Sequence, residues 1–153
     1  MNISALTKRL KKERVIFVGL GIENLALLGC LLKQDPAFAA TVYDARSAAA
    51  LGERYAKLKK YRNLIWKLGE QRPMSFESWS LIIKSSGAFL SPAERRALAK
   101  RGIAVSSALQ YFLDICPTKN IIGVTGTKGK GTTASLIAVI FKKTGKRVWL
   151  GGN

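Results

Sequence analysis

The chain has 153 residues, of which 48% are apolar, so it can bury a core and is not an intrinsically disordered segment. It contains no histidine, which excludes a Ser-His-Asp triad, a zinc site with histidine ligands and acid–base catalysis by imidazole. Its 26 Lys and Arg residues against 9 Asp and Glu give a net charge of +17, which is typical of proteins with phosphate-bearing partners. Two cysteines without a CxxC motif favour a reducing compartment, and no apolar run reaches the ~20 residues of a membrane span. We therefore expect a cytoplasmic protein without a membrane partner.

Apolar segments of the strand and helix types alternate along the chain, which predicts an α/β fold with a mainly parallel sheet. One helix has a clear start, because Ser91-Pro92-Ala93-Glu94 has the pattern of a capping box, and Gly102 marks its end. The strands are expected at 15–18, 40–43, 64–66, 81–83 and 103–105, and the helices at 24–33, 47–62, 91–101 and 108–115.

Cys116-Pro117-Thr118 reads as a domain boundary. We expect a Rossmann-like domain over residues 1–117 and the first β-α-β unit of a P-loop ATPase domain over residues 118–153. This second unit would consist of a strand at 121–124, a glycine-rich loop, a helix at 132–143 and a strand at 147–150. Because so short a unit cannot bury both faces of a parallel sheet, we expect the chain to be a fragment.

The glycine-rich segment 123–133 lies between an apolar strand and an amphipathic helix, which is the setting of a phosphate-binding loop. Its glycines allow backbone amides to turn toward an anion, and the following helix N-terminus favours negative charge. Lys130 adds a positive charge for the phosphates, and a hydroxyl group of Thr132 or Thr133 can bind Mg²⁺. The sequence therefore predicts a nucleotide phosphate site in this segment.

A second motif, Gly19-Leu20-Gly21-Ile22-Glu23-Asn24, follows the first strand. It is similar to the dinucleotide-binding fingerprint, with Asn24 in place of the third glycine. Asp44 follows the second strand at about the spacing of a ribose-binding carboxylate. A tight turn with Asp44 as a helix cap fits these residues equally well.

Taken together, the two motifs resemble the Mur ligases, a family of ATP-dependent amide-bond ligases. The segment 126–132 matches the loop Gly-Thr-x-Gly-Lys-x-[Ser/Thr] of that family, and within the family the branch that adds D-glutamate is most similar. The resemblance covers the whole chain and about a third of a full-length member. Its other matching stretches are 15–24, 43–46, 82–87 and 122–153.

The resemblance implies ATP and Mg²⁺ as cofactors, with Lys130 as a catalytic residue that stabilises the transferring phosphoryl group and Thr132 as a metal ligand. It also implies UDP-N-acetylmuramoyl-L-alanine and D-glutamate as substrates, joined through an acyl phosphate in peptidoglycan synthesis. The ATP-phosphate residues that it implies are Gly126, Thr127, Lys128, Gly129, Lys130, Gly131, Thr132 and Thr133, and the UDP-substrate residues are Gly21, Ile22, Glu23, Asp44, Arg46 and Gly87.

No acidic residue follows Asp114, although a nucleotide-hydrolysing site needs carboxylates for Mg²⁺. In the family these carboxylates, a modified lysine and the amino-acid-binding domain come later in the chain, so we expect this segment to be inactive alone, and monomeric. Two alternatives stay open. One is a Mur ligase that adds L-alanine, and the other is a non-catalytic NAD(P)- or nucleic-acid-binding module, favoured by Arg46 and the net charge. The absence of a nucleic-acid-binding motif speaks against nucleic acid.

Overall fold

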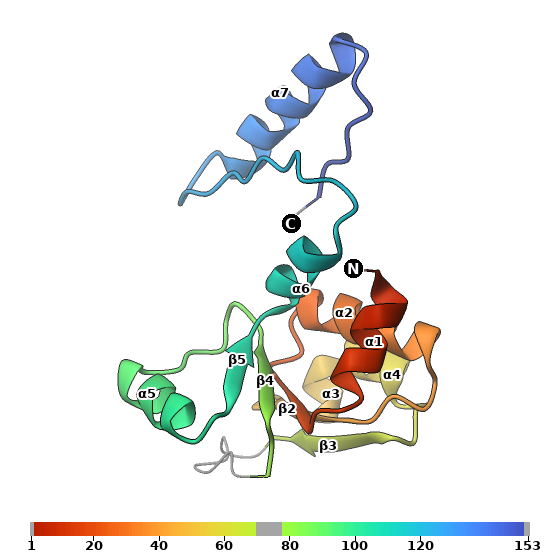
Figure 1. The fold of residues 1–153 in the computed structure, drawn as a ribbon, viewed down its shortest axis with the longest axis vertical. Coiled ribbons are helices and arrows are strands. Elements are labelled where there is room, and N and C mark those ends of the chain that lie inside the picture. The colour runs from red at the N-terminus through yellow and green to blue at the C-terminus, as the bar shows by residue number, and fades with distance from the viewer. Residues whose placement is uncertain (1, 70–77, 152–153) are drawn as a thin grey trace. The chain divides into compact units, whose positions relative to one another are not determined.

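The computed structural model describes residues 2–69 and 78–151 (Figure 1). Residues 1, 70–77 and 152–153, which fall within the two predicted domains, lie outside the described part. The chain divides into two units, residues 1–117 and 118–153.

The first unit is built on a five-stranded parallel sheet, as the alternating pattern predicts. Its strands are β1 (Val15–Val18), β2 (Ala40–Asp44), β3 (Leu64–Leu68), β4 (Leu81–Lys84) and β5 (Ala104–Ser106). Their order in the sheet is β3-β2-β1-β4-β5, and Phe17 of β1 pairs with Val42 on one side and Ile83 on the other. The strand order therefore reverses between β1 and β4. Parallel α/β sheets bind ligands at the carboxyl ends of the strands on either side of such a reversal.

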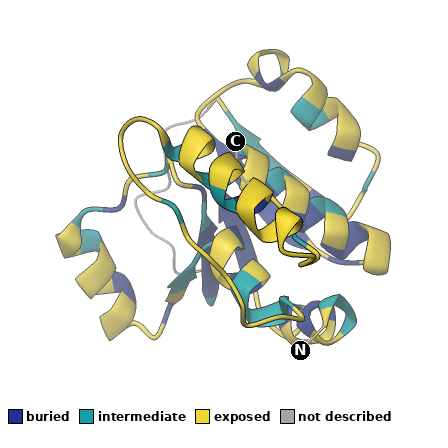
Figure 2. Ribbon diagram, turned by 90° about the horizontal axis from the view of Figure 1, so that it is seen from above, coloured by how far each residue is buried: buried dark blue, intermediate teal, exposed yellow. Residues whose placement is uncertain are grey.

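Helices cover both faces of the sheet, and alternate strand residues face each layer (Figure 1). Val15 and Phe17 pack in one hydrophobic cluster with α1 (Ile3–Leu10), α2 (Ile22–Gln34) and α6 (Ala108–Ile115). Ile16 and Val18 pack in a second cluster with α5 (Pro92–Lys100) on the opposite face. Figure 2 shows the strands as the most buried part of this unit.

Two predicted helical regions differ from the sequence pattern. The helix expected at 47–62 is two short helices, α3 (Ala48–Leu51) and α4 (Glu53–Leu58), because Gly52 between them has φ +53° and interrupts the hydrogen-bond ladder. The basic N-terminal segment, for which no element was expected, forms α1. Its Leu6 and Leu10 are buried against the sheet, and Asn2 caps it. By contrast, the predicted capping box at Ser91 and Glu94 is confirmed.

The second unit contains one described helix, α7 (Lys130–Lys143), which begins two residues before the predicted start. The strands expected at 121–124 and 147–150 are not formed, so the predicted β-α-β unit is not confirmed. A strand exists only when it pairs with a neighbour, and no described segment pairs with either of these. Apolar side chains of this unit are exposed, among them Leu136, Ile140 and Trp149. None of the described helices is both long and apolar enough to span a membrane.

Candidate functional site

Three segments meet at the carboxyl edge of the sheet, where β1, β2 and β4 end. They are 19–23 after β1, 44–46 at the end of β2 and 85–87 after β4. The topology brings all six residues predicted for the UDP substrate to this edge. They are Gly21, Ile22, Glu23, Asp44, Arg46 and Gly87.

Asp44 is only 4% exposed, and its carboxylate is fully engaged within the chain. One oxygen accepts a hydrogen bond from the Leu20 amide at 2.7 Å and from Arg46 Nη2 at 2.8 Å, and the other accepts from Arg46 N and Nε, both at 2.9 Å. Burial opposes ionisation of this carboxyl, but these hydrogen bonds outweigh it and lower the pKa of Asp44. Asp44 therefore ties the β1–α2 loop to β2. It does not cap a helix, because the N-caps of α2 and α3 are Gly21 and Ser47.

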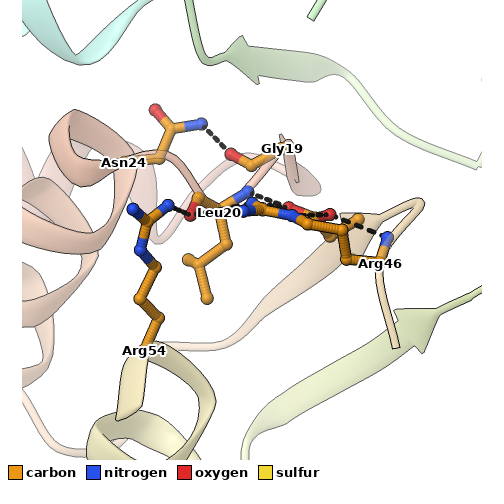
Figure 3. A network of polar contacts seen from close by, with 6 residues as sticks. Gly19, Leu20, Asn24, Arg46 and Arg54 are labelled. Carbon is orange, nitrogen blue, oxygen red and sulfur yellow. Dashed lines mark hydrogen bonds and ion pairs between the residues drawn. The ribbon is translucent and has the colours of Figure 1, made fainter. Parts of the chain in front are cut away.

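Two guanidinium groups converge on the carbonyl oxygen of Leu20 in this loop (Figure 3). Arg46 Nη2 lies 3.4 Å from that oxygen, and Arg54 Nη1, from α4, lies 3.2 Å from it. Arg46 is 45% exposed, so its guanidinium can contact both Asp44 and solvent. Two positive charges, the buried carboxylate of Asp44 and the carboxylate of Glu23 thus lie at this loop.

Asn24 fastens β1 to β4 directly behind the same loop (Figure 3). Its Nδ2 donates to Gly19 O at 2.8 Å and to Ile83 O at 3.2 Å, and the residue is fully buried. Gly19 has φ +81°, which a residue with a side chain rarely adopts, and a Cβ there would meet Ser85 Oγ after β4, so glycine at position 19 suits the approach of the two strand ends. Asn24, at the position of the third glycine of the fingerprint, therefore holds the ends of β1 and β4 together.

The N-terminus of α2 opens toward this edge without a side-chain cap. Its N-cap is Gly21, which has no side chain to accept hydrogen bonds from the first amides of the helix. The next residue, Ile22, is 64% exposed. Glu23 accepts a hydrogen bond from Ser86 Oγ at 3.1 Å, which joins the loop to the turn after β4. Uncapped amides at a helix N-terminus attract anions and suit a phosphate group, whereas the Glu23 carboxylate in the same first turn opposes one.

The predicted phosphate loop, residues 126–133, lies at the start of α7. Gly126 and Gly129 have φ +152° and +73°, and Gly129 is the N-cap, with no side-chain cap and no acidic residue in the first helical turn. Lys130 folds back over the loop, and its Nζ lies 2.6 Å from Gly126 O. Glycine turns, a lysine and bare helix amides suit a phosphate.

Thr132 is exposed on the first turn of α7, where its hydroxyl group can reach a metal ion held by a bound phosphate. Within the described residues, no three His, Cys, Asp or Glu side chains gather into a group that could hold a metal ion. The residues present therefore fit Mg²⁺ only as a partner of nucleotide phosphates.

Arg54 is the residue of this region that the sequence motifs do not mark. It lies among Glu53, Lys57 and Lys59 in a basic helix, and nothing in the local sequence separates it from them. Asn24, by contrast, is visible in the sequence because it occupies a position where the fingerprint has glycine.

Several curated proteins similar to this chain share one name. A UDP-N-acetylmuramoylalanine–D-glutamate ligase of Clostridium kluyveri is 35% identical over 153 residues, which are 99% of this chain and 32% of the relative. Proteins of the same name from Symbiobacterium thermophilum and Clostridium novyi are 36% and 30% identical and cover 93% and 94% of the chain. This chain is a relative of these ligases.

The predicted resemblance to the D-glutamate-adding Mur ligases is thereby confirmed, although no family model matches the chain. The chain spans about a third of the length of the curated relatives that it matches. The similarity extends through both units, so it includes the carboxyl edge of the sheet and the loop before α7.

Proposed function

We propose that this chain is part of an ATP-dependent ligase that joins D-glutamate to UDP-N-acetylmuramoyl-L-alanine through an acyl phosphate. The reaction would belong to cytoplasmic peptidoglycan precursor synthesis. The observation that carries the proposal is similarity over 99% of the chain to ligases whose name contains these reactants. The two regions described above suit the two phosphate-bearing substrates, because each presents uncapped helix amides beside basic side chains.

The carboxyl edge of the first unit would bind the UDP group. The amides that follow Gly21 would face the diphosphate, and Arg46 would contact the nucleotide from β2. Asp44 would act indirectly, because its oxygens already hold Leu20 and Arg46 in place. Gly87 has open space around it, which allows a ligand to approach the turn after β4.

The loop before α7 would bind ATP. When bound, ATP supplies the phosphoryl group that activates the L-alanine carboxylate, and Mg²⁺ offsets the charge of its phosphates. Lys130 would exchange its bond to Gly126 O for phosphate oxygens, and the amides of residues 129–133 would orient the phosphates. Thr132 would provide one oxygen to the metal ion.

Calorimetric titrations of the 153-residue chain test the proposal. We expect UDP-N-acetylmuramoyl-L-alanine and Mg·ATP each to bind, and saturation with one to leave the affinity for the other unchanged, because their sites lie in different units. Competition between them would contradict the two-site assignment. Salt-sensitive binding to generic DNA without binding of the UDP substrate would instead support the nucleic-acid-binding alternative.

A further inference from the structure

We propose that Arg54 binds the diphosphate of the UDP substrate directly and forms, with Arg46, a pair of guanidinium groups at the carboxyl edge. The inference rests on the proposed function and adds a residue to that site. Its basis is the position of Arg54, whose Nη1 lies 3.2 Å from Leu20 O in the loop that precedes α2 (Figure 3).

The first step of the argument is the placement of the Arg54 side chain. Leu20 precedes Gly21, the N-cap of α2, so the guanidinium stands beside the loop that leads to the uncapped amides of that helix. Arg46 reaches the same carbonyl oxygen from β2. The two guanidinium groups therefore both donate to the carbonyl oxygen of one peptide group.

The second step concerns charge. Asp44 is matched by Arg46 in a 2.8 Å ion pair, and Glu23 bonds to the hydroxyl group of Ser86. Glu23 keeps its negative charge, because a hydroxyl group does not neutralise a carboxylate. Among the described residues Arg54 forms no ion pair, so its guanidinium has no direct carboxylate partner there. A diphosphate is the part of the substrate that suits such a guanidinium, since guanidinium groups bind phosphate oxygens through paired N–H donors.

The third step concerns the Leu20 carbonyl itself. A bare carbonyl oxygen beside the α2 N-terminus would repel a phosphate, whereas one covered by two guanidinium groups presents positive charge in its place. Arg54 has five N–H donors, and within the described residues it uses one of them on Leu20. The remaining donors are available for a ligand.

The test compares UDP with uridine as probes, because only UDP carries the diphosphate. Both are titrated by calorimetry or NMR against the 153-residue chain and three variants, Arg54→Gln, Arg54→Lys and Lys59→Gln. Lys59 is the matched control, since it is an exposed cation at the C-cap of the same helix. Arg54→Lys retains the positive charge but lacks the paired N–H donors of the planar guanidinium group. Circular dichroism checks that each variant is folded.

We expect Arg54→Gln to weaken UDP binding about tenfold, the loss of one charge-assisted hydrogen bond at a partly exposed site, without changing uridine binding. Arg54→Lys should lose less, and Lys59→Gln should stay within about twofold of the parent chain. Unchanged UDP affinity in Arg54→Gln overturns the proposal, as does an equal loss for UDP and uridine, which would mean that Arg54 only supports the loop. A parent chain that binds no UDP refutes the proposed function itself, and is a separate result.

Discussion

Replacement of Asp44 by asparagine tests whether this carboxylate holds the β1–α2 loop. Asparagine has nearly the same shape, but it has one acceptor oxygen where the carboxylate has two. The oxygens of Asp44 accept hydrogen bonds from the amides of Leu20 and Arg46 and from two guanidinium nitrogens of Arg46. At least one donor must therefore lose its partner, and the new amide N–H groups face donors.

The magnitude follows from which donors can find water instead. Arg46 is 45% exposed, so solvent can replace most of its lost interaction, and its contribution is small. The Leu20 amide bonds to a carboxylate that is 4% exposed, and an orphaned buried donor costs ~1–3 kcal/mol. Because the arginine is half-exposed, the lost ion pair adds little to this cost, and we expect Asp44→Asn to destabilise the first unit by ~2 kcal/mol.

Native-state hydrogen exchange at the β1 amides is a suitable assay, because it reports opening of the first unit without interference from the second. A loss of ~2 kcal/mol makes exchange through global opening about thirtyfold faster. Asp35→Asn is the matched control. Asp35 pairs with Lys11 at 2.6 Å on the surface, so its loss should change exchange far less. Exchange in Asp44→Asn within about threefold of the parent chain would refute the reasoning.

Three further expectations follow from the same structure. The pKa of Asp44 is lowered from 3.8. The ionised carboxylate therefore stabilises the fold above pH 3.8, and this stabilisation is lost as the pH falls through the lowered pKa. The urea midpoint of Asp44→Asn should therefore fall less on acidification than that of the parent chain. Gly19→Ala should destabilise the first unit by ~2 kcal/mol or more, because position 19 has φ +81° and the added methyl group meets Ser85 Oγ; a urea midpoint equal to that of the parent would contradict this. Lys130→Ala should weaken Mg·ATP binding about tenfold and leave UDP binding intact, and calorimetry showing an equal loss for both ligands would contradict separate sites.

Local sequence signals predict the elements of the first unit well. Short β-branched runs mark the strands, and the helix at Ser91 is fixed by side chains three residues apart, so these elements need no distant information. Other features depend on distant partners. The runs at 121–124 and 147–150 have strand-like composition but form no strands, because pairing is a property of neighbours and not of the segment.

The candidate site shows the same division. The motif at 19–24 and the position of Asp44 indicate the carboxyl edge in advance, since both follow strands of a parallel sheet. The sequence leaves open whether Asp44 contacts a ligand or the chain. In the structure its carboxylate bonds to Leu20 and Arg46, and a contact with the UDP substrate stays a prediction. Arg54 could not be selected, because only the folded arrangement brings it to Leu20.

The break in the helix at Gly52 affects the direction in which the Arg54 side chain points. Successive residues of an uninterrupted helix are rotated by about 100°, so one helix continuing from α3 through α4 would fix the direction of position 54 by the helix phase alone. The turn at Gly52, with φ +53° and ψ −124°, resets that phase, and α4 begins anew at Glu53 with the Arg54 guanidinium at Leu20 O. Gly52 thereby sets the direction of the arginine side chain for which we propose a contact with the diphosphate. A side chain at position 52 would be strained at φ +53°. Relief of that strain would rotate α4 and move the Arg54 guanidinium away from Leu20.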